Sequence, residues 1–181
     1  MRWIKRSGFG SETPSYREMV GIEDRVAMTV RQECLMEHAI HPLGGSGQQW
    51  DTWMAMFSPK DPQTGFPKRL FDHRTGKIDR AVLEHWKQFD IARMVRHDWE
   101  TYGPIVTQRI RLACGERDNY YLPRAVKRFQ QMVDQHRNDD EGGDGYILLQ
   151  DHADHSNLMA FIYQRFNSEM REHFRKHGYH D

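Results

Sequence analysis

The clearest evidence for a fold class lies in residues 110–136, which read IRLACGERDNYYLPRAVKRFQQMVDQH. The stretch begins with a short apolar run that ends in glycine, Ile110 to Gly115, as a buried strand does. Pro123 then suits the first turn of a helix, because a backbone N–H at that position would have no partner within the helix. Apolar residues follow at helical spacing as far as His136. The stretch therefore predicts a strand followed by a helix.

A second strand and helix are predicted further along the chain. After a charged, glycine-rich turn at residues 137–145, the run YILLQ at 146–150 is strand-like. Apolar residues from Leu158 to Phe174 then recur at the spacing of an amphipathic helix. This alternation favours parallel strands joined by a crossover helix, so we expect an α/β layer in residues 101–181. Two strands alone do not form a stable open sheet. Either the first half supplies more strands or the sheet is incomplete.

Residues 1–100 differ from the rest of the chain because they are rich in turn-forming residues. Gly, Pro, Ser and Asp are frequent in SGFGSETPS, HPLGGSGQQ and SPKDPQTGFPKRLFDHRTG, which indicates loops. Three segments between the loops are compatible with helices, at residues 16–28, 48–57 and 78–95. We therefore expect a loop-rich helical insertion or cap with few strands.

Composition narrows the classes of function. The 181 residues include 26 Lys and Arg and 26 Asp and Glu, and this balance argues against nucleic-acid binding. No run of about 18 apolar residues occurs, so we expect no membrane span. The start MRWIKRSGFG lacks the apolar core of a signal peptide, which leads us to expect a cytoplasmic protein. Cys34 and Cys114 are far apart and do not indicate a disulfide framework.

Polar side chains follow both predicted strands. The segment GERDNYYL places Asp118 after the first, and DHADHSNL places Asp151, His152, Asp154 and His155 after the second. In parallel α/β sheets functional groups gather beyond the carboxyl ends of the strands, so a carboxylate and a histidine from these two segments can meet. A carboxylate in this position fixes the tautomer of a histidine that acts as a general base.

Two other interpretations of these residues remain open. Asp118 could cap the helix that follows it, since aspartate favours such positions. His152, Asp154 and His155 are of types that bind zinc, but neighbouring residues point in different directions and no further ligand cluster occurs. We expect no metal and no other cofactor.

A nucleophile for acyl transfer is not evident in the sequence. The nucleophile elbow G-x-S-x-G is absent. Ser46 lies among glycines in LGGSGQQW and follows no apolar strand, and Ser11 in GFGSETP is similarly unsupported. Cys114 lies within the predicted strand rather than at its end, so we expect a buried apolar role for it.

Four segments resemble esterase D-like putative esterases of the α/β-hydrolase fold. They are YREMVGIEDRV at 16–26, WMAMFSPKDPQTGFPKRLFDHRTGKIDRAVLEHWKQFDIARMV at 53–95, RIRLACGERDNYYLPRAVKRFQQMV at 109–133 and DHADHSNL at 151–158. The resemblance implies the C-terminal part of a hydrolase sheet, with Asp118 as the triad acid and His155 as the general base. It also implies that the nucleophile serine and the oxyanion-hole loop precede the part of such proteins that this sequence covers.

These observations lead to two hypotheses about function. The first is a fragment of a carboxylic-ester hydrolase that is inactive alone and acts on an ester substrate once a complementing N-terminal segment supplies the serine. The second is a non-catalytic remnant or interaction module that needs a partner, or self-association, to complete its sheet. An unpaired edge strand is a template for association, which is the reason for the second hypothesis.

Overall fold

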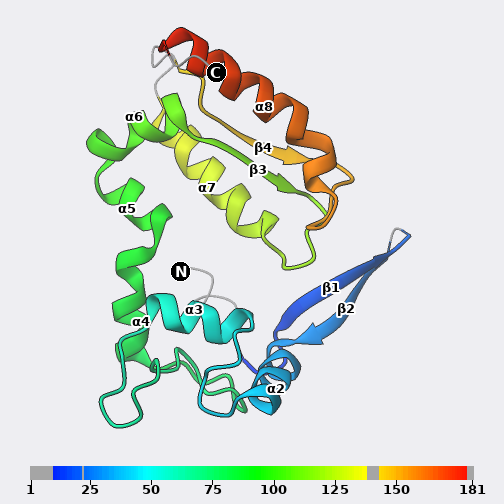
Figure 1. The fold of residues 1–181 in the computed structure, drawn as a ribbon, viewed down its shortest axis with the longest axis vertical. Coiled ribbons are helices and arrows are strands. Elements are labelled where there is room, and N and C mark those ends of the chain that lie inside the picture. Colours follow the sequence, from blue (N-terminus) through cyan, green and yellow to red (C-terminus); the bar gives the residue numbers. More distant parts are fainter. Residues whose placement is uncertain (1–9, 22, 138–142, 179–181) are drawn as a thin grey trace. The chain divides into compact units, whose positions relative to one another are not determined.

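A computed structural model describes residues 10–21, 23–137 and 143–178 of the chain. The chain divides into two compact units, Met1–Gly103 (unit 1) and Pro104–Asp181 (unit 2). The described residues form seven α-helices and two two-stranded sheets, so the protein is mixed α/β (Figure 1). None of the helices in the described ranges is long and apolar enough to cross a lipid bilayer.

The elements of unit 1 are β1 (Pro14–Val20), β2 (Glu23–Thr29), α2 (Val30–Ile40), α3 (Gln49–Phe57), α4 (Arg80–Trp86), the 3-10 helix η1 (Lys87–Phe89) and α5 (Ile91–His97). Helix α6 (Trp99–Arg109) crosses the boundary between the units. The elements of unit 2 are β3 (Arg111–Gly115), α7 (Pro123–His136), β4 (Tyr146–Gln150) and α8 (Leu158–Lys176). Part of the predicted turn at 137–145 and the residues before Gly10 lie outside the described ranges.

The helix predicted at residues 16–28 is wrong, because this segment forms the antiparallel hairpin of β1 and β2. Gly21 has a φ of +65°, a left-handed conformation that a helix cannot contain and that glycine adopts at little cost. Charged side chains then pair across the strands, Arg17 with Asp24 at 2.7 Å and Arg25 with Glu18 at 3.1 Å. Pairs of opposite charge on facing strands stabilise a hairpin modestly. The first half therefore contains strands that turn signals alone did not predict.

Helix α2, which the sequence analysis missed, begins with a capping box. The Thr29 side chain accepts a hydrogen bond from the Gln32 backbone N–H, and the Gln32 side chain accepts one from the Thr29 N–H. These reciprocal bonds satisfy two N–H groups that a helix start leaves unpaired. The helix thus begins where β2 ends.

Helix α3 forms as predicted, but a side chain from α2 caps its start. The Glu37 carboxylate accepts hydrogen bonds from the backbone N–H groups of Trp50 and Asp51, at 2.8 and 2.9 Å. Glu37 is completely buried. A carboxylate at a helix N-terminus meets both the unpaired N–H groups and the positive end of the helix dipole. Burial raises the pKa of Glu37, and the two hydrogen bonds from α3 oppose that rise. This buried carboxyl group therefore links α2 to α3.

The single helix predicted at residues 78–95 is interrupted. Asp79 caps α4 by accepting hydrogen bonds from the N–H groups of Ala81 and Val82. Asp90 caps α5 in the same way, by accepting from the Arg93 N–H. Because a capping residue has an extended backbone, Asp90 ends one helical stretch and begins the next.

The core of unit 1 combines aliphatic and aromatic side chains from these elements. Trp50 of α3 packs edge-on against Phe71, with the ring centroids 5.0 Å apart. Burial of these side chains removes apolar surface from water, and the large aromatic rings remove the most for each residue. The buried members of the core are Val30, Cys34, Met54, Leu70, Phe71, Val82, Leu83 and Trp86.

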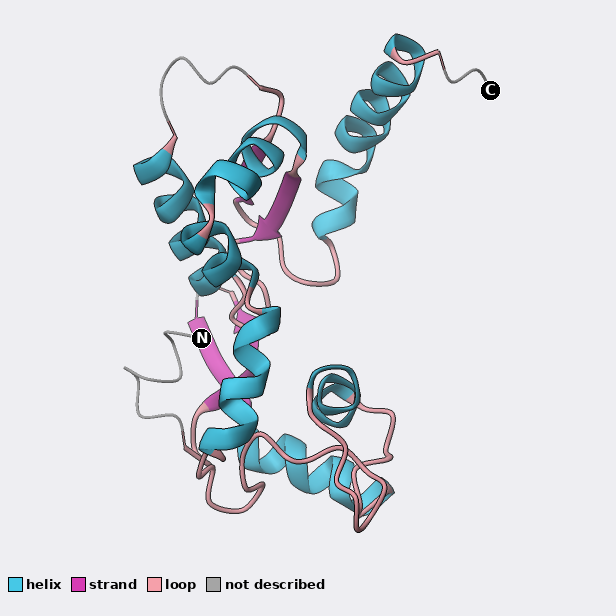
Figure 2. Cartoon of the chain, turned by 90° about the vertical axis from the view of Figure 1, so that its left-hand side faces the viewer, coloured by secondary structure: helices cyan, strands magenta, loops and turns pink. Residues whose placement is uncertain are grey.

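Unit 2 has the predicted order of strand, helix, strand and helix. Strands β3 and β4 are parallel, with Arg111 opposite Tyr146 and Gly115 opposite Gln150. In Figures 1 and 2 the two strands lie between α7 and α8. Strands β1 and β2 pair only with each other, so within the described ranges the parallel sheet has two strands. The carboxyl ends of both strands lead into the loops that carry the predicted site residues.

Candidate active site

Asp118 lies in a tight turn that follows β3 directly. Its backbone N–H donates to the carbonyl oxygen of Gly115 at 3.1 Å, which closes the turn. Its Oδ1 accepts a hydrogen bond from the Tyr120 N–H at 2.8 Å. The side chain is only 3% exposed, so the carboxylate is held in one orientation. The residue at the N-cap of α7 is Leu122, so Asp118 does not cap that helix.

His155 lies in the loop between β4 and α8. Two side chains shape this loop, because Asp154 Oδ1 accepts the N–H groups of Ser156 and Asn157 while Asn157 Oδ1 accepts the Asp154 N–H, all at 2.8 Å. The His155 backbone N–H donates to Asn119 Oδ1 at 3.2 Å. The loop is therefore fixed by its own polar side chains and by a residue next to Asp118.

The structure brings Asp118 and His155 together. His155 Nδ1 lies 2.8 Å from Asp118 Oδ2, a normal hydrogen-bond distance. An ionised carboxylate can only accept, so it pairs with an Nδ1–H, and in the neutral imidazole Nε2 is then the acceptor. The His155 side chain is 52% exposed, and its Nε2 has no hydrogen-bond partner among the described residues. A buried acid thus orients an imidazole whose side chain is half exposed.

The two loops are joined by backbone contacts as well. The Ala153 carbonyl oxygen accepts the N–H of Arg117 at 2.9 Å, and the Gln150 carbonyl oxygen accepts that of Glu116 at the same distance. Ala153 is completely buried. These bonds extend the pairing of β3 and β4 beyond the strand ends. The distance between Asp118 and His155 therefore depends on the strand register.

Tyr121 and His152 have left-handed backbone conformations, with φ of 59° and 60°. They are the two such non-glycine residues in the described ranges, and they lie in the two loops of this site. This conformation is costly for residues with a Cβ atom and is maintained by the surrounding structure, most often at functional sites. The Tyr120 ring packs edge-on against the His155 ring, with the two centroids 5.0 Å apart. This contact further restricts the orientation of the imidazole.

The remaining polar residues of the second loop have structural partners. Asp151 accepts the backbone N–H of His152 and lies 3.2 Å from its Nε2. The Asp154 carboxylate accepts hydrogen bonds from the backbone N–H groups of Ser156 and Asn157. Among the residues that the structure describes, no group of three or more His, Cys, Asp or Glu side chains could hold a metal ion.

Cys114 is not placed to act as a nucleophile. Burial raises the pKa of its thiol to about 11, and the charge of Asp118 contributes to this rise. A thiol with so high a pKa is protonated at neutral pH and therefore unreactive. Cys114 instead contributes to the buried side of β3.

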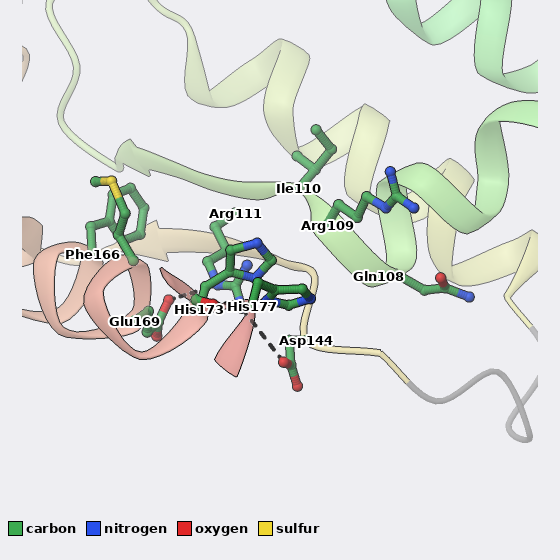
Figure 3. Close-up of a pocket in the computed structure, with 10 residues that line it drawn as sticks. Gln108, Arg109, Ile110, Arg111, Asp144, Phe166, Glu169, His173 and His177 are labelled. Carbon is green, nitrogen blue, oxygen red and sulfur yellow. Dashed lines mark hydrogen bonds and ion pairs between the residues drawn. The ribbon is translucent and has the colours of Figure 1, made fainter. Parts of the chain in front are cut away.

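A pocket of about 750 Å³ lies at the opposite, amino-terminal end of β3 (Figure 3). Two of its lining residues pair with each other, since Glu169 lies 2.9 Å from Arg111 Nε. Glu169 also accepts hydrogen bonds from Tyr146 and Arg165, which do not line the pocket. Burial raises the pKa of Glu169, but hydrogen bonds from Arg165 and Tyr146 outweigh it and lower the pKa overall. This network ties α8 to both strands, which gives the charges of Glu169 and Arg111 a structural role.

Two residues of the site, Asn119 and Tyr120, were not predicted from the sequence. Both lie in the segment GERDNYYL beside Asp118, but neither residue type indicates a contact with a distant loop. Comparison of the chain with protein-family models, with curated proteins and with solved structures finds no match.

Proposed function

We propose that unit 2 carries the acid and the general base of a serine-type carboxylic-ester hydrolase, in which Asp118 orients His155. The observation that supports this proposal is the 2.8 Å hydrogen bond between His155 Nδ1 and the buried Asp118 carboxylate, beyond the carboxyl ends of two parallel strands. The resemblance of the GERDNYYL and DHADHSNL segments to esterase D-like α/β-hydrolases points to the same two residues.

In this proposal His155 Nε2 accepts the proton of a serine hydroxyl while the serine oxygen attacks the ester carbonyl. The imidazolium that forms is stabilised by Asp118, and His155 then returns the proton to the departing alcohol. A second cycle with water releases the acid. The sequence contains no G-x-S-x-G motif, so the serine and the oxyanion hole are supplied by another polypeptide segment.

The experiment is an assay with a chromogenic short-chain ester. The chain alone should give no turnover, and a polypeptide that supplies the serine motif and oxyanion hole should restore it. His155→Ala should abolish the restored activity, while His152→Ala serves as the matched control because His152 lies in the same loop with a 69% exposed side chain. Equal activity in the two variants would contradict the proposal.

The second candidate is an interaction module whose sheet is completed by a partner. It is favoured by the small parallel sheet, because within the described ranges β3 and β4 pair only with each other. Light scattering coupled to size-exclusion chromatography distinguishes the two candidates. A stable, fully folded monomer that complements an esterase supports the hydrolase proposal, whereas obligate self-association without complementation supports the module.

A further inference from the structure

Unit 1 contains a second pocket, which lies between α2 and the turn before α4 and has a volume of about 270 Å³. Its lining residues are Leu35, His38, Arg69, Asp72, His73 and Arg74. His73 is the buried member of this set, with an exposed fraction of 5%. Neither of its ring nitrogens has a hydrogen-bond partner among the described protein groups. The pocket therefore contains a buried polar side chain that the fold does not satisfy.

An unsatisfied buried imidazole is costly. A neutral imidazole has one N–H donor and one acceptor nitrogen, and leaving such groups unpaired away from water costs free energy. Residues of this kind call for an explanation in terms of a bound molecule or a function. A ligand with acceptor oxygens in the pocket would provide a partner for the His73 N–H.

The turn that presents His73 is already rigid. Asp72 Oδ1 accepts hydrogen bonds from the N–H of Arg74, the N–H of Thr75 and the Thr75 hydroxyl, at 3.0, 2.7 and 2.8 Å. Gly76 has a φ of +70°, and a Cβ atom there would lie 2.5 Å from the backbone of Gly10. Since the turn is locked by these contacts, the pocket is formed before any ligand binds.

Among the side chains that line the pocket, two arginines outnumber one carboxylate. Arg69 and Arg74 face a single lining carboxylate, Asp72, whose Oδ1 is fully used within the turn. Arg69 also donates to the Pro42 carbonyl oxygen, which orients its guanidinium. The Arg74 side chain is exposed and has no partner within the described ranges. Asp51, the other carboxylate whose charge acts on His73, accepts the Ser46 N–H.

We propose that this pocket binds a small oxyanion of the phosphate or carboxylate class, held by His73 at its base and by Arg69 and Arg74 at its rim. Guanidinium groups match both anions because they donate parallel hydrogen bonds to paired oxygens. His38 lines the same pocket and adds a further donor. The proposal goes beyond the ester chemistry of unit 2 and does not depend on it.

The test is calorimetric titration of the whole 181-residue chain with inorganic phosphate and, separately, with acetate, at constant ionic strength in chloride. We expect saturable binding of at least one of the two anions, and the preferred anion identifies the class. Arg74→Gln, at an exposed position that leaves the turn intact, should weaken binding about tenfold, as loss of one charge-assisted contact does.

Arg93→Gln is the matched control, because Arg93 is an exposed arginine of unit 1 that does not line the pocket. It should bind the anion as the unmodified chain does. Absence of saturable binding for both anions would overturn the proposal, and so would equal affinity of the Arg74→Gln and Arg93→Gln variants.

Discussion

Gly115 and Ala153 approach so closely that a Cβ atom on Gly115 would lie 2.3 Å from the Ala153 carbonyl oxygen. The last residue of β3 and the loop after β4 therefore touch backbone to backbone. The same carbonyl oxygen accepts the Arg117 N–H, two residues beyond Gly115. The loop that carries His155 rests on the end of β3 through this contact, so the residue at position 115 determines where the imidazole lies.

Gly115→Ala should displace the His155 loop. No side chain fits at this position without movement of the Ala153 backbone, and overpacking of this kind costs about 1–3 kcal/mol. We expect a lower free energy of unfolding in urea and the loss of the downfield proton signal of a hydrogen-bonded His155 Nδ1–H. Gly45→Ala is the matched control, because the atoms nearest to its Cβ would be those of the His41 side chain, at 3.0 Å, and not backbone atoms. Equal effects of the two substitutions would show that the Gly115 contact does not position the loop.

Asp118→Asn should change the tautomer of His155. The asparagine side chain can donate to Nδ1, which would transfer the ring proton to Nε2 and remove the acceptor that a general base requires. Nitrogen NMR of the histidine rings measures the tautomer without any need for catalysis. Asp151→Asn, which alters the exposed partner of His152 in the neighbouring loop, should leave the His155 signals unchanged. An unchanged His155 tautomer in Asp118→Asn would contradict the proposed role of the acid.

The elements of unit 2 could be predicted because each has a local signal. Ile110–Gly115 is a short apolar run, Pro123 begins a helix, and the apolar run at 146–150 needs no partner to be recognised. The meeting of Asp118 and His155 follows from the general property that parallel strands end at one edge of a sheet. Their mutual orientation could not be predicted, because it depends on Asn119, Tyr120 and the close approach at Gly115.

The elements of unit 1 were harder to predict because distant partners determine them. The hairpin of residues 14–29 depends on cross-strand pairs such as Arg17 with Asp24, which a local helical pattern does not indicate. Helix α3 was predicted, but the group that caps it was not, because Glu37 reaches its start from another helix. The burial of His73 likewise results from tertiary packing rather than from its polar surroundings in the sequence.

Glu37→Ala should destabilise unit 1 by about 2 kcal/mol or more, because it removes a helix cap and leaves two backbone N–H groups, one of them buried, without this partner. Urea unfolding followed by tryptophan fluorescence is a direct measurement, since Trp50 donates one of the two bonds. The matched control is Glu84→Ala on α4, where the carboxylate is 66% exposed and forms an ion pair with Lys87. Surface pairs contribute little, so this control should lose well under about 1 kcal/mol. Similar losses in both variants would mean that the Glu37 cap is not stabilising.

His73 should make the stability of the fold fall as the pH is lowered. Burial, together with the charge of Arg69, lowers the pKa of its imidazole from 6.5 to about 4. Between these values the unfolded chain binds a proton at this residue and the folded chain does not, so the free energy of unfolding decreases with decreasing pH. The loss approaches about 3 kcal/mol over this window.

The contribution of His73 can be isolated by comparing the unmodified chain with His73→Leu across the same pH range. The leucine variant cannot take up the proton, so the difference in unfolding free energy between the two proteins should narrow or reverse in favour of the variant as the pH falls from 6.5 to about 4. His152→Gln is the control, because its side chain is 69% exposed and its replacement should leave the pH dependence of the unmodified chain in place. Parallel stability curves for the unmodified chain and His73→Leu would show that the fold does not lower the pKa of the His73 imidazole.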